Sequence, residues 1–412
     1  MSKENIKIGL FGFGCVGKGL WNVLEQTPGI RAEILKICVK DRAKTRPVDA
    51  SYFTFNADEL LYNEEVQVIV ELIDDAEAAY HIVRTALSNG KAVITANKKM
   101  LAEHFEELYH LQQKHRVPLL YEAACCASIP VIRNLEEYYD NDLLHSIAGI
   151  VNGSTNFILT RIFRDGVSYP EALEQAQALG FAETDPRLDV EGFDARYKLS
   201  LLLTHAFGIR VAPKAIFSLG ITRISPYDAQ FAGEKDCGIK LIARAVKLPG
   251  NRVAAFVAPA FVRRDDPFYH VHDEYNAVKI QSSFADRQLF VGKGAGAFPT
   301  ASAVLSDISA LTYQYKYEYK KIVQASVPEL SNDFVVDVFV SYNPGRDITA
   351  DFIRVEEQFS SAARNYLVGS IRFERLLAAE WAKDPAYSII LKADTEIPVI
   401  RYEPQAELAF HY

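Results

Sequence analysis

Residues 6–20 read IKIGLFGFGCVGKGL and decide how the first part of the chain folds. Ile6–Phe11 predicts a short buried strand, and the segment KGLWNVLEQ (residues 18–26) predicts a helix. Between them stands G-x-G-x-x-G, whose glycines permit a tight turn, a close approach of pyrophosphate and close helix–strand packing. The pattern predicts a dinucleotide site, and a glycine-rich turn without a ligand is the alternative. The expected cofactor contacts are Gly12, Phe13, Gly14, Cys15, Val16 and Gly17.

Strand-like and helix-like segments alternate as far as residue 121. Apolar strands are predicted at 34–39, 66–73, 93–95 and 118–121, and helices at about 76–88 and 102–115. This alternation indicates an α/β fold built on a Rossmann-type doubly wound parallel sheet. Such sheets bind ligands at the carboxyl ends of their strands, so Lys98, which follows the strand at 93–95, is a candidate contact for cofactor or substrate.

A basic cluster, KDRAKTR (residues 40–46), follows the second predicted strand. In this fold an acid at that place binds the ribose 2′-hydroxyl of NAD, whereas basic residues bind the 2′-phosphate of NADP. Asp41 is surrounded by cations, among which Lys40 and Arg42 are the expected contacts. The cluster favours NADP, with NAD tolerated, and a solvated charged turn is the alternative.

Composition excludes several classes of partner. The chain has 412 residues and a net charge of −8, which argues against nucleic acid and anionic membranes. No apolar run approaches the roughly 18 residues that a membrane helix needs. The five cysteines show no C-x-x-C spacing, which is typical of a reduced chain, so we expect a cytoplasmic protein.

The stretch ETDPRLDVEGFDARYK (residues 183–198) is densely charged and is followed at once by the apolar segment LSLLLTHAF. If a helix begins near Asp194, then Asp194 and Lys198 project from the same face, one turn apart. An amine beside a carboxylate at the start of a buried helix could grip a small polar substrate and exchange a proton with it. The alternative is an ordinary surface ion pair.

Two loops could complete a site around this pair. Residues 152–156 (NGSTN) follow a predicted strand at 144–151 and offer small hydrogen-bonding groups. Asn152 and Thr155 could bind the carboxylate or amine of a substrate, or the loop could cap the following helix. A second glycine-rich turn, residues 292–302, leads into a helix and could return to the cofactor.

We expect three domains. Residues 1–133 form the dinucleotide-binding domain, which a returning segment at about 297–325 completes. Residues 134–296 form an α+β catalytic and dimerisation domain, with short helices over 211–250 and strands at 253–262 and 277–292. Residues 330–412 form a small α+β appendage, with a helix at about 350–362 and no clear hairpin.

Six segments together resemble the homoserine dehydrogenase family over about residues 5–320. They are GLFGFGCVGKGL, VIVELI, TANKKMLA, GIVNGSTNFIL, ETDPRLDVEGFDARYKL and GKGAGAFPTASAV, in the order found in that family. The resemblance implies reversible reduction of L-aspartate 4-semialdehyde to L-homoserine with NADPH or NADH, on the route to threonine and methionine.

The resemblance also implies roles for individual residues. Lys198 would handle the proton at the substrate oxygen, and Asp194 would help to hold the substrate and orient that lysine. Glu183 would bind the substrate amino group, and Asp189 would lie in the same pocket. Lys98 matches a lysine that lies at the cofactor and substrate.

Further implied contacts concern the cofactor and a cation. Gly296 would approach the cofactor from the second glycine-rich turn. The family often binds a monovalent cation, typically sodium, largely through backbone carbonyls of a loop that matches Glu122, Cys125, Ala127 and Ile129. Here that loop reads Cys-Cys-Ala-Ser (125–128) where the family is usually glycine-rich, and Asp74-Asp75 replace a usual pair of glycines after VELI. Positive φ at Cys126 or Ser128 would suit those side chains poorly.

The C-terminal residues only loosely resemble the ACT-type regulatory module that often accompanies this family, so we expect a degenerate version of it. The family implies a small-molecule substrate and a homodimer or higher homo-oligomer. Two other functions stay open on the sequence. One is a related oxidoreductase acting on another amino-acid-like substrate, and the other is a catalytically inactive nucleotide-binding sensor.

Overall fold

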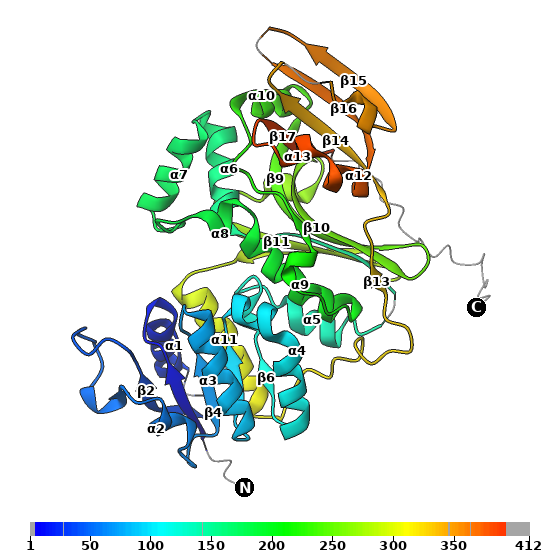
Figure 1. The fold of residues 1–412 in the computed structure, drawn as a ribbon. Coiled ribbons are helices and arrows are strands. Elements are labelled where there is room, and N and C mark those ends of the chain that lie inside the picture. Colours follow the sequence, from blue (N-terminus) through cyan, green and yellow to red (C-terminus); the bar gives the residue numbers. More distant parts are fainter. Residues whose placement is uncertain (1–4, 28, 142, 345–346, 363, 393–412) are drawn as a thin grey trace, which may run out of the picture.

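The computed structural model describes residues 5–392, with the exception of residues 28, 142, 345, 346 and 363. Residues 1–4 of the expected first domain and residues 393–412 of the expected third domain lie outside the described residues. The described part of the chain forms two sheets with helices packed against both (Figure 1). Within this part, no helix is both long and apolar enough to cross a membrane.

The N-terminal sheet has six parallel strands in the order β3-β2-β1-β4-β5-β6, which is the doubly wound order. Its strands are β1 (Ile6–Phe11), β2 (Ala32–Cys38), β3 (Phe53–Thr54), β4 (Val68–Glu71), β5 (Ala92–Thr95) and β6 (Leu119–Leu120). The helices of this layer are α1 (Cys15–Gln26), α2 (Asp58–Leu61), α3 (Ala76–Ser88), α4 (Lys98–His115) and α11 (Ala297–Leu311). The predicted Rossmann-type sheet is confirmed.

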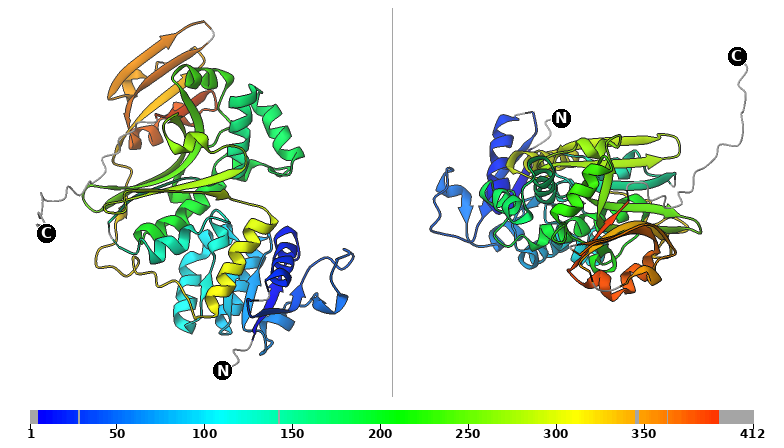
Figure 2. Two further views of the ribbon diagram at one scale, coloured as in Figure 1. Left: turned by 180° about the vertical axis from the view of Figure 1, so that it is seen from behind. Right: turned by 90° about the horizontal axis from the view of Figure 1, so that it is seen from above.

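Helix α11 packs in this N-terminal layer although it follows the second sheet in chain order. Figure 2 shows it alongside α1, behind the sheet as seen in Figure 1. A Cβ at Gly19 of α1 would lie 2.7 Å from the carbonyl oxygen of Ala297, so the two helices meet too closely for any larger residue there. The returning chain therefore packs directly against the helix that begins at the glycine-rich turn.

The second sheet has eleven strands, nine of them in the order β12-β11-β7-β9-β10-β17-β14-β16-β15, and two short strands pair with β10. Its strands are β7 (Leu144–Ile150), β8 (Phe217–Ser218), β9 (Cys237–Leu248), β10 (Arg252–Arg263), β11 (Tyr275–Ser282), β12 (Arg287–Lys293), β13 (Glu329–Leu330), β14 (Val335–Tyr342), β15 (Arg354–Ser360), β16 (Asn365–Arg372) and β17 (Tyr387–Leu391). Its helices are α5 (Val131–Glu137), α6 (Gly153–Asp165), α7 (Tyr169–Ala178), α8 (Arg187–Val190), α9 (Phe193–Phe207), α10 (Pro226–Glu234), α12 (Phe373–Ala378) and α13 (Glu380–Lys383). Helix α9 contacts β7, β9 and β10 as well as α4 and α5, so it lies between the two sheets (Figure 1).

The prediction of short helices throughout 211–250 was wrong for its second half. Strand β9 pairs with β10 over its whole length, from Cys237 opposite Arg263 to Leu248 opposite Arg252. Nearly all of β9 is buried, so it lacks the polar and apolar alternation that marks a half-exposed strand. Its cations recur at the three- and four-residue spacing of a helix face, at Lys240, Arg244 and Lys247.

The predicted helix at 350–362 was also wrong. Only a short 3-10 turn, Thr349–Asp351, precedes β15, an edge strand whose residues are mostly exposed and therefore carry no burial pattern. The consecutive strands β15 and β16 pair antiparallel, as in a hairpin, so the expectation of no clear hairpin was wrong as well. The resulting order of elements is that of a ferredoxin-like unit with a shortened first helix. A parallel contact between Leu391 of β17 and Ala260 of β10 joins this unit to the rest of the sheet.

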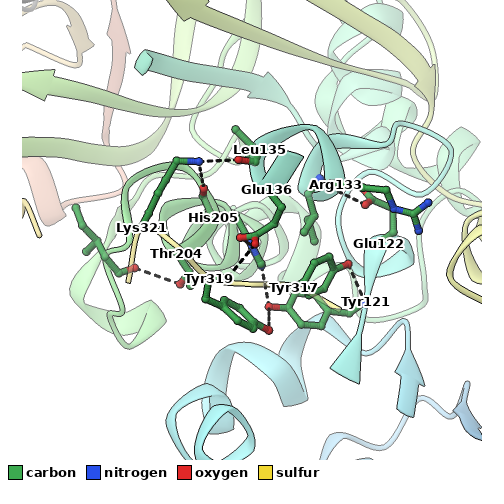
Figure 3. A network of polar contacts seen from close by, with 12 residues as sticks. Tyr121, Glu122, Arg133, Leu135, Glu136, Thr204, His205, Tyr317, Tyr319 and Lys321 are labelled. Carbon is green, nitrogen blue, oxygen red and sulfur yellow. Dashed lines mark hydrogen bonds and ion pairs between the residues drawn. The ribbon is translucent and has the colours of Figure 1, made fainter. Parts of the chain in front are cut away.

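A buried polar network fastens α9 to the N-terminal layer (Figure 3). His205 of α9 lies with Nε2 2.7 Å from the hydroxyl oxygen of Tyr121, and its Nδ1 lies 2.6 Å from Oε1 of Glu136 on α5. The backbone N–H of Tyr319 donates to Oε2 of Glu136 at 3.0 Å. Lys321 donates to the carbonyl oxygens of Leu135 and His205. Because each buried polar group here has a partner, the network orients α9 instead of destabilising the core.

We predict that two glycines with the same backbone conformation differ in what they tolerate. Gly166 ends α6 with φ +67° and would meet nothing within 4 Å as alanine, whereas Gly208 ends α9 with φ +76° and its Cβ would lie 2.1 Å from the carbonyl oxygen of Lys321. Gly166→Ala should cost about 1 kcal/mol for the left-handed conformation alone. Gly208→Ala should cost about 1–3 kcal/mol more because the contact forces the backbone apart. Urea denaturation measures both, and equal losses would contradict the packing assigned to Gly208.

Candidate active site

The glycine-rich turn between β1 and α1 has two packed glycines and one open one. Gly12 has φ +93°, and a Cβ there would lie 2.5 Å from the carbonyl oxygen of Leu72. A Cβ at Gly17 would lie 2.4 Å from the carbonyl oxygen of Gly12, while a Cβ at Gly14 would meet nothing within 4 Å. Gly14 thus leaves open space at the N-terminus of α1, where free N–H groups are available and the first turn contains no acid. The turn therefore fits the pyrophosphate of a dinucleotide.

The other residues of this turn differ in what they present. Phe13 is buried, and its ring packs edge-on against Trp21 and Phe53, so only its backbone is available to a cofactor. Cys15 is exposed at the start of α1, and Val16 lines the cavity described below.

The basic cluster after β2 is exposed. Lys40 lies 3.4 Å from a carboxylate oxygen of Asp75, and the guanidinium of Arg42 lies 4.7 Å from the centre of the Phe55 ring. Oδ1 of Asp41 accepts the backbone N–H groups of Ala43 and Lys44, so this acid holds its own loop together. The cluster therefore presents cationic side chains to solvent.

The acid pair after β4 has divided roles. Asp75 caps α3 by accepting the N–H of Ala78 at 3.0 Å, whereas Asp74 lines the cavity. Only one of the two acids therefore faces the space in which a cofactor would lie.

The carboxylate of Asp194 is the centre of the site. Helix α9 begins at Phe193, as predicted, and places Nζ of Lys198 2.8 Å from Oδ2 of Asp194. Nζ of Lys98, the first residue of α4, lies 2.9 Å from Oδ1 of the same carboxylate. Asp194 and Lys198 are 5 % and 6 % exposed, so this is not the surface ion pair considered as the alternative. A second lysine, from helix α4 of the N-terminal layer, completes the charge arrangement.

The charges of this group support one another. Burial acts to raise the pKa of Asp194, but Lys198 and Lys98 hold that pKa well below its usual range. Burial acts to lower the pKa of Lys198, but the carboxylate of Asp194 raises it above its ordinary value. Both directions agree, so at neutral pH Asp194 is a carboxylate and Lys198 is an ammonium group.

Asn152 connects this pair to the next acid. Its Oδ1 accepts the N–H of Thr155 and so caps α6, while its Nδ2 donates to Oδ1 of Asp189 at 2.6 Å and to Oδ2 of Asp194 at 2.9 Å. The buried hydroxyl of Thr155 also donates to Asn152, which places Thr155 behind the site. Burial, followed by the charge of Asp194, raises the pKa of Asp189.

A single cavity of about 540 Å³ joins these groups to the glycine-rich turn. It brings together eight of the residues predicted from the sequence: Val16, Lys98, Asn152, Glu183, Asp189, Asp194, Lys198 and Gly296. Its lining does not include Thr155, Lys40, Arg42, the other residues of the glycine-rich turn (Gly12–Cys15 and Gly17) or the predicted cation contacts Glu122, Cys125, Ala127 and Ile129. A larger cavity of about 890 Å³ opens between α10 and the C-terminal strands and contains none of the predicted residues. The smaller cavity is therefore the candidate active site.

The sequence did not identify Glu274 and Thr300, which also line this cavity. Glu274 stands alone in an irregular loop, and its carbonyl oxygen would lie 2.7 Å from a Cβ at Gly153. Thr300 lies in the first turn of α11, at the end of the second glycine-rich turn, but nothing in the sequence singled it out from its neighbours there. The glycine-rich turn at 292–302 was the signal that could have identified Thr300, whereas Glu274 carried no spacing or composition signal.

The loop matched to a cation site is strained and acidic. Cys126 has φ +58° and Ala127 has φ +40°, so two adjacent residues with side chains take a conformation that favours glycine. Both carboxylate oxygens of Glu122 accept backbone N–H groups at the start of α5, from Ile132 and Arg133. In the described part of the chain, no group of three or more His, Cys, Asp or Glu side chains is arranged to hold a metal ion. A cation in this loop would therefore depend on carbonyl oxygens, including those of Cys125, Ala127 and Ile129.

Comparisons with known proteins point in one direction. The family model described as "Homoserine dehydrogenase" matches residues 130–309, and that described as "Homoserine dehydrogenase, NAD binding domain" matches residues 12–122. A homoserine dehydrogenase of Mycobacterium leprae (strain TN) is 31% identical over 424 residues, which cover 97% of this chain and 96% of the relative.

Solved structures agree with these matches. A homoserine dehydrogenase from Thiobacillus denitrificans has a TM-score of 0.84 at 27% identity, covering 94% of this chain and 98% of that one. A hyperthermophilic archaeal homoserine dehydrogenase mutant in complex with NADPH has a TM-score of 0.65 at 26% identity, covering 76% of this chain and 99% of that one. With a glycine turn fitted to a dinucleotide, a lysine–carboxylate pair in the same cavity and relatives that match almost the whole chain, this chain belongs to the homoserine dehydrogenase family.

Proposed function

We propose that Lys198 transfers the proton, and that Asp194 holds it in position, in the NAD(P)-dependent interconversion of L-aspartate 4-semialdehyde and L-homoserine that this chain catalyses. The observation that carries this assignment is the 2.8 Å contact between Lys198 Nζ and Asp194 Oδ2 inside the cavity that reaches the glycine-rich turn. This activity takes the place of the two other functions that the sequence left open.

The geometry explains how this chain's residues would act. The nicotinamide ring, when bound, supplies or takes the hydride. During reduction an alkoxide develops on the substrate oxygen, and the ammonium group of Lys198 stabilises that charge and donates the proton. During oxidation the neutral amine of Lys198 must accept the proton instead. Because the pKa of Lys198 is raised, oxidation is favoured by alkaline pH.

The remaining side chains of the cavity would bind the amino-acid part of the substrate. Glu183 and Asp189 supply carboxyl groups for its amino group, and Lys98 supplies a cation for its carboxylate. The side chain of Lys98 is 38% exposed, so it can contact a ligand while it remains bound to Asp194. Asn152 orients both acids of the site through its amide.

We also propose that NADP is preferred and that NAD is accepted. Asp41 already accepts two N–H groups of its own loop, whereas Lys40 and Arg42 are exposed cations beside it. The NADPH complex of the archaeal relative is consistent with this preference. A 2′-phosphate would therefore meet positive charge at the adenosine end of the site.

We make three further proposals, which concern a sodium site, the C-terminal residues and the cellular compartment. Glu122 is buried close to Asp307 and Arg133, and burial raises the pKa of Glu122 to about 8, so a sodium ion in the adjacent loop would stabilise its charged form. An increase in thermal stability when choline is replaced with sodium tests this site.

We propose that residues 330–412 are a degenerate ACT-like module. Measuring whether amino acids change the enzyme activity tests this proposal. The five cysteines are free thiols, which suits the cytoplasm.

A homodimer is proposed through the edge of the second sheet. Strand β12 forms that edge, and its Leu289 and Val291 are exposed apolar side chains. An unpaired edge with apolar residues is suited to a second copy of the chain. Light scattering of the purified protein decides between a monomer and a dimer.

Replacing the proton-transfer residue should remove turnover but not cofactor binding. Lys198→Ala should lower kcat by roughly two to four orders of magnitude, because it removes the group to which the proton transfer is assigned. Lys99→Ala, which changes an exposed lysine beside Lys98, is the control and should leave kcat unchanged. Steady-state kinetics and fluorescence titration with NADPH measure the two properties. Near-normal turnover in Lys198→Ala would rule out the proposed role.

Removing a cation from the basic cluster should change cofactor choice. Arg42→Ser should raise KM for NADP⁺ about tenfold or more relative to KM for NAD⁺, since a charge-assisted hydrogen bond contributes about 1.5–3 kcal/mol. Arg31→Ser, at the opposite end of β2, is the control and should alter neither value. An equal change in both KM values would contradict a 2′-phosphate contact at Arg42.

A further inference from the structure

The segment VIVELI contains a buried acid to which the proposed mechanism gives no role. Glu71 is the last residue of β4 and is fully buried. It pairs in register with Thr95, the last residue of β5. Burial raises the pKa of Glu71 to about 7, against the opposing effect of its hydrogen bonds, and the nearby Asp74 adds to the rise. A carboxyl group in such a place is costly, so its partners indicate what it does.

Glu71 joins the two strand ends that form one wall of the active-site cavity. Its Oε2 accepts the hydroxyl of Thr95 at 2.5 Å, and its Oε1 accepts the backbone N–H of Ile73 at 2.6 Å. The residues that follow each strand, Leu72–Asp74 and Ala96–Lys98, line the cavity, whereas Glu71 and Thr95 do not. Glu71 and Thr95 therefore each stand one residue before the segment that lines the cavity, and Glu71 does not face the space for a ligand.

The hydrogen bonds continue from Thr95 to the start of α4. Oγ1 of Thr95 accepts the backbone N–H of Asn97 at 3.0 Å. The side chain of Asn97 accepts the N–H of Met100 at 3.0 Å, which caps α4, and donates to the carbonyl oxygen of Ile73 at 3.2 Å. The cap fixes where α4 begins. Lys98 is the first residue of that helix, and its Nζ lies 2.9 Å from Asp194.

We propose that Glu71 is a positioning residue: through the hydroxyl of Thr95 and the cap at Asn97, it sets the place from which Lys98 reaches Asp194. This inference rests on the proposed function, because it assigns Glu71 and Thr95 an effect on turnover only through Lys98. Each step is a hydrogen bond of 2.5–3.0 Å between buried or half-buried groups, so we expect a loss at one end to displace the other. A displacement of about 1 Å in a catalytic group can cost about 100-fold in rate.

The test is a double-mutant cycle between Thr95 and Lys98. Thr95→Val keeps the shape of the side chain but removes the hydroxyl, and Thr95→Ser, the matched control, keeps the hydroxyl. Thr95→Val should lower kcat/KM for homoserine about 10- to 100-fold, with the affinity for NADPH nearly unchanged. Thr95→Ser should stay close to the unmodified enzyme. If the side chain of Thr95 acted only by filling space, Thr95→Ser would not retain more activity than Thr95→Val.

The cycle separates the possible failures. In a Lys98→Ala background, Thr95→Val should cause little further loss, because both changes act through the same contact. Losses that multiply in the double variant, or a Thr95→Val enzyme of normal activity, would overturn the positioning role. A Lys98→Ala enzyme of normal activity would instead overturn the role proposed for Lys98 itself. If Thr95→Val fails to bind NADPH, Glu71→Gln replaces it in the same cycle, and multiplying losses there would overturn the proposal.

Discussion

A buried carboxylate must have its hydrogen-bonding capacity filled, and the carboxylate of Asp194 meets that requirement with groups from three places in the chain. Lys198 comes from the same helix, Asn152 from the loop after β7, and Lys98 from the start of α4. Leaving such a group unpaired would cost several kcal/mol, so the three partners hold one another in position as well as the acid. The candidate active site is thus the place where charged side chains of α9 and α4 join the two layers of the fold.

Contacts outside the site hold helix α9 against the N-terminal layer and so support these interactions. Helix α9 carries both Asp194 and Lys198 at its start, and near its end His205 enters the network of Tyr121, Glu136 and Tyr319 (Figure 3). Both ends of the helix are therefore tied to the N-terminal layer. A hydride transfer needs the cofactor and the proton donor in a fixed relation, and this arrangement supplies it through packed elements instead of a mobile loop.

Local patterns in the sequence predicted the parts of the site that are local in the structure. Gly17 is required by a close contact with Gly12 in the same turn, and Asp194 and Lys198 are neighbours because of the pitch of one helix. The contact between Lys98 and Asp194 joins distant segments, and only the family resemblance placed both residues in one site. Glu274 lines the cavity, but no local sequence pattern indicated this. Strands β9 and β15 were misread because one is covered on both faces and the other on neither, so burial gave no alternation to recognise.

The pH dependence of homoserine oxidation by Asp194→Asn tests the central claim most directly. If Asp194 both orients Lys198 and raises its pKa, the variant should lose turnover, and the rising limb of its profile should move to lower pH, since an opposite charge is removed. NADPH affinity measured on the same sample controls for folding. A profile that keeps the position of its rising limb, with turnover near that of the unmodified enzyme, would contradict the claim that this carboxylate organises the site.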